Sequence, residues 1–172
     1  MRTILLTLCL FMGTILSAQN NVLIEIENAN ADYKVITGDF VRTQTNVAKG
    51  TFIKADGMLY IVGEDQMAQH YKAPSTDLLI INGNDFYMIR GKKTNKFNTE
   101  KNKAMRSLRN TLLYCVHGKP MVLATENGAE ITAEKKENEY EVVLISTKKT
   151  PRGYAKIFLT YDLKSKLLTK MQ

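Results

Sequence analysis

The chain has few of the residues that most enzymes use for catalysis. Its 172 residues include two cysteines, two histidines and three prolines, and tryptophan is missing. Cysteine and histidine supply many of the nucleophiles, bases and metal ligands of proteins, and neither His70 nor His117 stands in a cluster with metal-ligand spacing. Glycine-rich phosphate loops and nucleophile-elbow serines are also absent from the sequence. These absences argue against an enzyme, and we expect no cofactor and no metal.

The cysteines do not supply a disulfide framework. Cys9 lies in an apolar stretch at the N-terminus, which leaves Cys115 as the cysteine of the remaining chain. A single cysteine excludes an intramolecular disulfide. Cys115 and His117 are two residues apart, and on a helix such residues point to different sides, so we do not expect a thiol–imidazole pair.

The N-terminus follows the pattern of a secretory signal peptide. Arg2 supplies a positive charge, residues 4–16 are almost entirely apolar, and Ser17-Ala18-Gln19 ends the run. The run is too short for a membrane-spanning helix, and a buried N-terminal strand or helix is the alternative interpretation. We predict that residues 1–19 are cleaved and that residues 20–172 form one domain of a soluble, exported protein.

The chain is basic, and it stays so without the predicted signal peptide. Loss of Arg2 lowers the formal net charge from +7 to +6. An exported protein meets little nucleic acid, so we expect an anionic membrane surface or lipid headgroups as partners of this charge; lysines that only solvate the surface are the alternative. The basic residues predicted to face headgroups lie in one stretch: Lys92, Lys93, Lys96, Lys101, Lys103, Arg106 and Arg109.

Most of the chain predicts short antiparallel strands separated by turn residues. Residues 22–33 fit either a strand or one helical face. In the last long strand Ile157, Leu159 and Tyr161 share an apolar face. The expected strands are residues 35–44, 47–54, 57–62, 67–73, 77–82, 85–90, 93–97, 120–126, 129–135, 139–147, 153–163 and 166–171.

One segment has helical periodicity instead. Apolar residues recur three or four positions apart from Met105 to Val116, which predicts an amphipathic helix over residues 99–117. Asn98 is the expected N-cap, and Gly118 with Pro120 is the expected stop. Many strands with a few such helices predict an α+β domain with the helices on one face of the sheet.

Residues 78–89 predict a hairpin whose strands are apolar at every position. Leu78–Ile81 and Phe86–Ile89 flank the turn residues Asn82-Gly83-Asn84-Asp85. A half-exposed strand would carry a polar residue at every second position. Either both faces of these strands are therefore covered, or one face lines an apolar cavity.

Three blocks and their spacing resemble a known family. Gly38–Gln44 is similar to the family's F-x-Q segment, Gly57–Pro74 to its G-x-(L/F)-(W/Y)-x…P block, and Leu79–Tyr87 to its hairpin. With these blocks, residues 22–118 resemble the periplasmic lipoprotein carriers of the LolA type.

The resemblance implies a curved antiparallel sheet that forms an incomplete barrel, with a helical lid over an apolar cavity. In that family the cavity takes up acyl chains of lipoproteins, which implies an inner-membrane exporter and an outer-membrane acceptor as partners. An arginine of an Arg-Pro pair latches the lid there, whereas Gly63 and Glu64 stand at the matching positions here. We therefore expect a weakly held lid. Because the chain stops at Gln172, where the family has further strands, we also expect either a more open barrel or a barrel edge that a partner covers.

We predict that alternate residues of the strands line this cavity together with the apolar stripe of the helix. Both faces of the strands are apolar, so the other set of alternate residues, which points the opposite way, is an alternative lining. The predicted lining residues are Leu59, Ile61, Leu79, Ile81, Phe86, Met88, Met105, Leu108 and Leu112.

Three functions fit the sequence. The first is a periplasmic carrier that shields acyl chains of lipoproteins or of another lipid-linked envelope molecule during transfer towards the outer membrane. The alternative is an envelope-stress sensor of the same fold, which binds lipidated proteins without transporting them. A small hydrolase on a lipid-binding scaffold is disfavoured, because no nucleophile–base pair is evident.

Overall fold

Two antiparallel sheets and three helices make up the part of the chain that the computed structural model describes, residues 21–72, 76–148 and 154–172. The predicted α+β class is confirmed. The chain divides into two compact units: Tyr33–Leu113 forms one, and Tyr114–Gln172 forms the other together with an N-terminal helix at residues 21–31. The predicted signal peptide at 1–19 lies outside the described residues, and a single domain over 20–172 stays a prediction.

The unit Tyr33–Leu113 contains a six-stranded sheet whose strands pair in sequence order. The predicted hairpin is confirmed, because Asn82 pairs with Asp85 and Gly83 adopts the left-handed φ of 57° that a tight turn favours. The strands are β1 (Val35–Asn46), β2 (Thr51–Val62), β3 (Gln66–Tyr71), β4 (Leu78–Asn82), β5 (Asp85–Arg90) and β6 (Lys93–Asn98), with a short 3-10 turn at Val47–Lys49.

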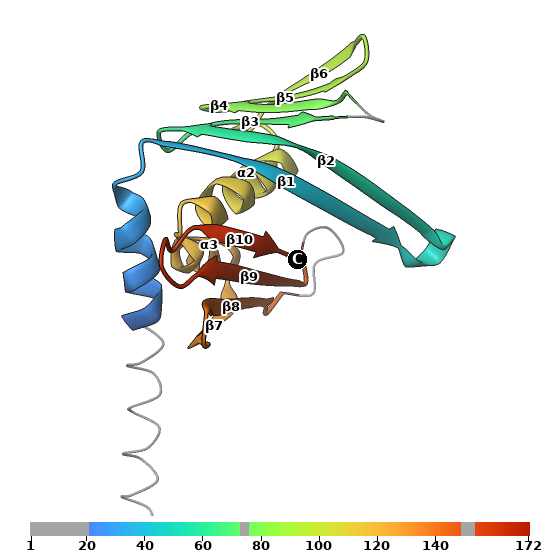
Figure 1. Cartoon of the computed structure of the whole chain (residues 1–172). Helices are drawn as coiled ribbons and strands as arrows, with labels where there is room; N and C mark the ends of the chain where they lie inside the picture. Colours follow the sequence, from blue (N-terminus) through green and yellow to red (C-terminus); the bar gives the residue numbers. More distant parts are fainter. Residues whose placement is uncertain (1–20, 73–75, 149–153) are drawn as a thin grey trace, which may run out of the picture. The chain divides into compact units, whose positions relative to one another are not determined.

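The first two strands are longer than their neighbours. Pairing of β2 with β3 ends where Gly57 meets Tyr71, whereas pairing of β2 with β1 continues to Thr51 and Asn46. Figure 1 shows the resulting two-stranded ribbon extending past β3. The prediction of separate strands at 47–54 and 57–62 is wrong. Gly57 lies inside a continuous strand, and the ring of Phe40 occupies the space that a side chain would need.

The helix α2 (Lys103–Val116) confirms the predicted helix but begins later. Its N-cap is Asn102, whose Oδ1 accepts a hydrogen bond from the backbone N–H of Met105 at 3.1 Å. The predicted N-cap, Asn98, is wrong because it is the last residue of β6, paired with Asp85. The Asn98 Oδ1 instead accepts from the N–H groups of the turn that follows, at Glu100 and Lys101.

A second helix, α3 (Pro120–Asn127), replaces the strand predicted at 120–126. Proline is favourable at the first helical position because its missing N–H would have no partner there. Gly128 ends the helix with a φ of 61°, and its N–H bonds back to the carbonyls of Ala124 and Thr125. The four apolar residues after Pro120 have no period that distinguishes a strand from a helix, so Pro120 at the start and the Gly128 cap at the end decide the structure.

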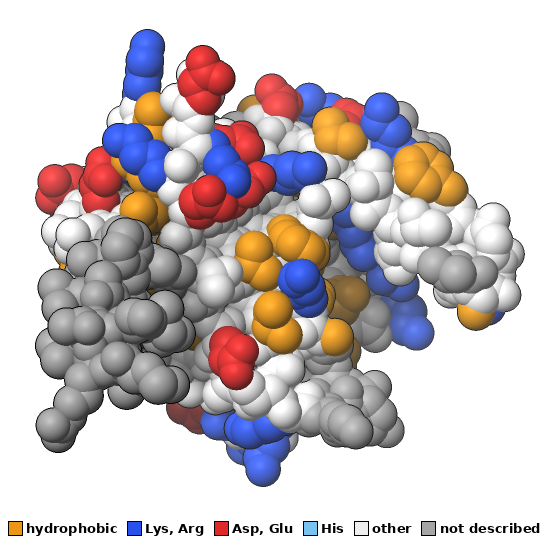
Figure 2. Space-filling view, turned by 90° about the horizontal axis from the view of Figure 1, so that it is seen from below, with side chains coloured by type: hydrophobic (Ala, Val, Ile, Leu, Met, Phe, Trp, Pro, Cys, Tyr) orange, Lys and Arg blue, Asp and Glu red, His pale blue; other side chains and the backbone are white. Residues whose placement is uncertain are grey.

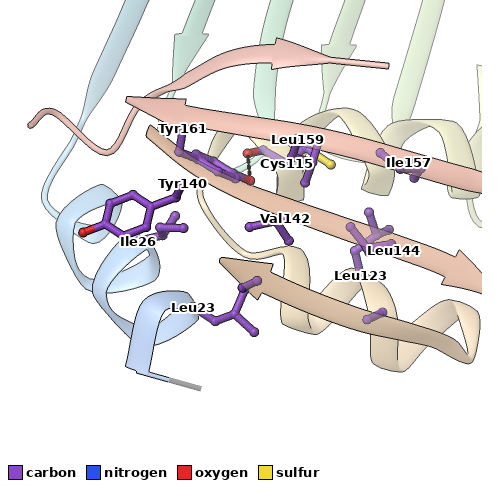
Figure 3. Packing of buried hydrophobic residues seen from close by; sticks show 12 residues of the cluster. Leu23, Ile26, Cys115, Leu123, Tyr140, Val142, Leu144, Ile157, Leu159 and Tyr161 are labelled. Atoms are coloured by element: carbon purple, nitrogen blue, oxygen red, sulfur yellow. Dashed lines mark hydrogen bonds between the residues drawn. The ribbon is translucent and has the colours of Figure 1, made fainter. Parts of the chain in front are cut away.

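The second unit contains a four-stranded sheet in the order β10-β9-β8-β7. Its strands are β7 (Ala129–Lys135), β8 (Glu139–Ser146), β9 (Lys156–Asp162) and β10 (Leu168–Met171). The predicted apolar alternation of the last long strand is confirmed, because Ile157, Leu159 and Tyr161 are buried and pair with buried residues of β8. Figure 3 shows these side chains packed with Leu23 and Ile26 of the helix at 21–31, which is therefore helical, not extended.

A polar cluster ties the helix at 21–31 to this sheet. Lys166 adopts a φ of 60°, and its Nζ lies 2.8 Å from Glu25 Oε1. The hydroxyl of Tyr140 also donates to Glu25 Oε1, at 2.8 Å, and the side-chain amide of Asn30 donates to the carbonyl of Lys166. The hydrogen bond from Lys166 lowers the pKa of Glu25 below its usual value. These contacts hold the helix on β8 and on the turn between β9 and β10.

Candidate functional site

The structure brings the six sheet residues of the predicted cavity wall onto one face. Paired residues of neighbouring strands lie on the same face of a sheet, and so do residues two apart along a strand. The pairs place Ile61, Ile81 and Phe86 in one cross-strand row with Met67 of β3. A second row on the same face contains Leu59, Leu79 and Met88 with Gln69 of β3. We call this surface the apolar face; its role as a cavity wall stays a prediction.

The two rows differ in accessibility. Ile61, Ile81 and Phe86 are at most 1% exposed, so they belong to the packed core. Leu59, Leu79 and Met88 are only half-buried. The second row is therefore the part of the apolar face that a bound molecule can touch.

The opposite face of the same sheet is also apolar, as the sequence predicted. It carries Leu78 and Ile80 of β4 next to Tyr87 and Ile89 of β5, all of them half-buried. Because each strand alternates its side chains, Leu79 and Ile80 are neighbours in sequence that point to opposite sides. This gives the chain a matched pair of positions at which the two faces can be compared.

An aromatic pair ends the apolar face on the side of β1. Phe40 pairs with Gly57, and Gly57 pairs with Tyr71, so all three lie on the apolar face. The rings of Phe40 and Tyr71 meet edge to face with their centroids 5.0 Å apart. A Cβ on Gly57 would lie 2.7 Å from Phe40 Cζ and 2.3 Å from the carbonyl oxygen of His70. Gly57 therefore has no room for a side chain.

Polar groups follow directly beyond the aromatic pair. The Nη1 of Arg42 donates to the Tyr71 hydroxyl oxygen at 3.3 Å, and its Nη2 donates to Gln44 Oε1 at 2.9 Å. The Tyr71 hydroxyl also lies 3.5 Å from Gln69 Oε1. Sequence reasoning missed this group, although Phe40, Arg42 and Gln44 alternate in a predicted strand, which was a signal that they share one face.

The predicted lining residues of α2 are less accessible towards the end of the helix. Met105 and Leu108 are half-buried, and Leu112 is 7% exposed. The Nε of Arg109 donates to the carbonyl of Gly83 at 2.7 Å, which ties α2 to the turn between β4 and β5. Whether Met105, Leu108 and Leu112 share a ligand with the apolar face stays a prediction.

Three of the residues predicted to face headgroups have partners within the protein. Lys96 forms an ion pair with Asp85 at 2.9 Å, and this hydrogen bond raises the pKa of Lys96. Arg106 donates to the backbone carbonyls of Thr99 and Glu100. Arg109 binds Gly83 as described above and also donates to Asn110 Oδ1 at 2.9 Å. Arg106 and Arg109 thus stabilise the turns around α2.

The other four predicted headgroup residues are exposed: Lys92, Lys93, Lys101 and Lys103. Figure 2 shows Lys and Arg side chains at several separate places on one face of the molecule, interspersed with Asp and Glu. Contact of the four lysines with headgroups stays a prediction.

Cys115 and His117, the pair considered for chemistry, are buried, whereas His70 is exposed. Cys115 is 0% exposed, and burial raises the pKa of its thiol to about 12, so the reactive thiolate is scarce at neutral pH. His117 is also buried, at 6% exposure. Within residues 21–72, 76–148 and 154–172, no group of three His, Cys, Asp or Glu residues is placed to hold a metal ion. No helix of the described chain is long and apolar enough to cross a membrane.

Comparisons with known proteins identify no family for this chain. The scan against protein-family models and the search of curated proteins gave no match. Among solved structures, the chain is similar to the crystal structure of a LolA superfamily protein from Nitrosomonas europaea, at 10% sequence identity and a TM-score of 0.37. The match covers 89% of this chain and 70% of that one. At this level the similarity identifies neither a family nor a function.

Proposed function

We propose that this protein is a carrier that shields the acyl chains of lipoproteins, or of another lipid-linked envelope molecule, during transfer towards the outer membrane. The observation that supports the proposal is the apolar face. Its half-buried row of Leu59, Leu79 and Met88 lies directly beside a fully packed row, so apolar area remains accessible on this face of the sheet. Apolar groups that are only partly covered gain free energy when a ligand removes them from water.

The energetics favour cargo with more than one chain. Burying ten methylenes contributes about 8 kcal/mol at about 0.8 kcal/mol each. Association costs of roughly 4–15 kcal/mol oppose this gain. One acyl chain therefore binds weakly and reversibly, whereas a molecule with two or more chains binds more tightly for a similar association cost.

In this proposal the protein works in the periplasm after cleavage of residues 1–19, and it acts by binding rather than by catalysis. An inner-membrane exporter would supply the cargo and an outer-membrane acceptor would receive it. The exposed side chains of Lys92, Lys93, Lys101 and Lys103 support a transient contact with anionic headgroups, an attraction that salt would screen.

The matched pair in β4 tests the proposal. In Leu79→Glu a carboxylate stands on the apolar face, and in Ile80→Glu the same change stands on the opposite face. A fluorescent fatty-acyl probe titrated into each purified protein should bind Leu79→Glu at least tenfold more weakly than the parent, because a buried unpaired carboxylate is costly. Ile80→Glu should stay within about twofold of the parent.

Urea unfolding of both variants separates loss of binding from loss of fold. Both positions are half-buried, so we expect similar losses of stability from the two substitutions. Equal loss of probe binding in the two variants, or a larger loss in Ile80→Glu, would show that the apolar face is not the binding surface. Failure of the parent protein to bind any acyl probe would reject the carrier function itself.

A further inference from the structure

Arg42 occupies a distinctive position at the end of the apolar face. It pairs with Ala55, two residues from the pair of Phe40 with Gly57, so its side chain shares the face with the aromatic pair. The order along this face is therefore apolar rows, then the rings of Phe40 and Tyr71, then a guanidinium. An amphipathic ligand has the same order of an apolar chain and a polar head.

The partners of Arg42 are neutral. Its Nη1 bonds to the Tyr71 hydroxyl and its Nη2 to the amide oxygen of Gln44. A guanidinium has five N–H donors, so donors remain beyond these two bonds. A carboxylate or phosphate group can take two of them at once, which is the geometry that arginine binds most strongly.

Three other basic residues of the sheet pair with carboxylates, whereas Lys54 and Lys93, like Arg42, form no ion pair within the described residues. Lys72 pairs with Asp39 at 2.9 Å, Lys96 with Asp85 at 2.9 Å and Arg90 with Asp77 at 3.6 Å. Within the part of the chain that the structure describes, Arg42 has no carboxylate within ion-pair distance. The charge of Arg42 therefore remains available for an anion that the protein does not supply.

The length of the face along the strands matches the length of an acyl chain. Four rows of side chains run along the strands from Arg42 to Ile61, beginning with the pairs Arg42–Ala55 and Phe40–Gly57 and ending with Ile36–Ile61. Three steps of two residues at about 3.3 Å per residue span roughly 20 Å. The hydrocarbon core of a bilayer is about 30 Å thick, so one leaflet's chains extend about 15 Å. A single chain thus fits between the packed row and the guanidinium.

We propose that Arg42, with Gln44, Gln69 and Tyr71 around it, binds the anionic head of an acyl ligand whose chain lies on the apolar face. The ligand class is an acyl chain that ends in a carboxylate or a phosphate ester. This inference rests on the proposed acyl-carrier function and narrows its cargo to those lipid-linked molecules whose heads carry a carboxylate or a phosphate.

Competition between matched ligands tests the inference. Nile red, a neutral apolar dye, is bound to the purified protein and displaced by dodecanoate, dodecyl phosphate or dodecanol, which share a chain length and differ in the head. Both anionic ligands should displace the dye at about tenfold lower concentration than dodecanol, because charge-assisted hydrogen bonds to arginine form with them alone. Inorganic phosphate without a chain should displace no dye.

Variants assign the preference to one side chain. Arg42→Gln should abolish the tenfold preference and leave the affinity for dodecanol within about twofold, whereas Arg42→Lys should retain part of the preference. Lys54→Gln is the matched control, because Lys54 pairs with Thr43 at the same end of the sheet and on the opposite face. Lys54→Gln should keep the full preference, and circular dichroism should show all variants folded.

The outcomes separate this inference from the function on which it rests. Equal displacement by all three ligands in the parent protein would overturn the role of Arg42 and leave the carrier function standing. Loss of the preference in Lys54→Gln as well as in Arg42→Gln would also overturn it, since net charge would then be the cause. If neither Nile red nor any dodecyl ligand bound, the proposed function would fail first.

Discussion

Substitution of Gly57 by alanine should destabilise the protein far more than a glycine-to-alanine change usually does. The new Cβ would lie 2.3 Å from the carbonyl oxygen of His70 and 2.7 Å from Phe40 Cζ. Real carbon–oxygen contacts are not this short, and the carbonyl belongs to the backbone of the neighbouring strand, so β2 and β3 must move apart. Inserting a methyl group into a packed site typically costs 1–3 kcal/mol, and we expect about 3 kcal/mol here because the obstacle is backbone.

The assay is urea unfolding monitored by circular dichroism. With a slope of about 1.5 kcal/mol per molar urea, a loss of about 3 kcal/mol lowers the midpoint by about 2 M. Gly38→Ala is the matched control: Gly38 lies on the same face in the adjacent strand, and a Cβ there meets nothing within 4 Å. Its midpoint should be unchanged or slightly higher, because alanine reduces the freedom of the unfolded chain.

A midpoint for Gly57→Ala close to that of Gly38→Ala would refute the packing of Phe40 on Gly57. The aromatic end of the apolar face would then have to be arranged differently.

Two further predictions concern pH. Burial raises the pKa of the Cys115 thiol to about 12 in the folded protein, against about 8.5 in an unfolded chain, so the unfolded state loses its proton first and the free energy of unfolding should fall as pH rises from about 9 towards 12. Cys115→Ala should show a smaller fall in urea midpoint over this range, and an equal fall would contradict the burial of the thiol. Glu25 has a lowered pKa, so its contribution is present at neutral pH and is lost as pH falls through that pKa. The difference in urea midpoint between the parent and Glu25→Gln should therefore shrink below about pH 4, and a constant difference would show that the Lys166 contact does not depend on the charge of Glu25.

The strands and their faces could be predicted where local signals agreed. Asn82 to Asp85 offers the residues of a tight turn, and once this turn fixes the register, Ile81 must lie on the same face as Phe86 and Leu79 on the same face as Met88. The alternate residues that the sequence analysis selected in each strand, six in all, lie on one face of the sheet. The amphipathic helix was also predictable, because Met105, Leu108 and Leu112 follow its period.

The errors have both tertiary and local causes. Gly57 was interpreted as the start of a new strand, whereas the glycine makes room for Phe40, a residue seventeen positions earlier, and only the paired strands reveal that contact. The apolar run after Pro120 became a helix because Gly128 closes it and Leu123 is buried in the second unit. Arg42 was not chosen as a candidate because its significance comes from what it lacks, a carboxylate partner, and no sequence pattern displays that.

The binding surface can be measured directly with a photoreactive fatty acid that carries a diazirine in its chain. The ligand is bound to the purified protein, irradiated, and located by tandem mass spectrometry at single-residue level. Cross-links at the half-buried row of the apolar face, Leu59, Leu79 or Met88, are the predicted result. Cross-links confined to Leu78, Ile80 or Tyr87 of the opposite face, or to neither face of the six-stranded sheet, would contradict it.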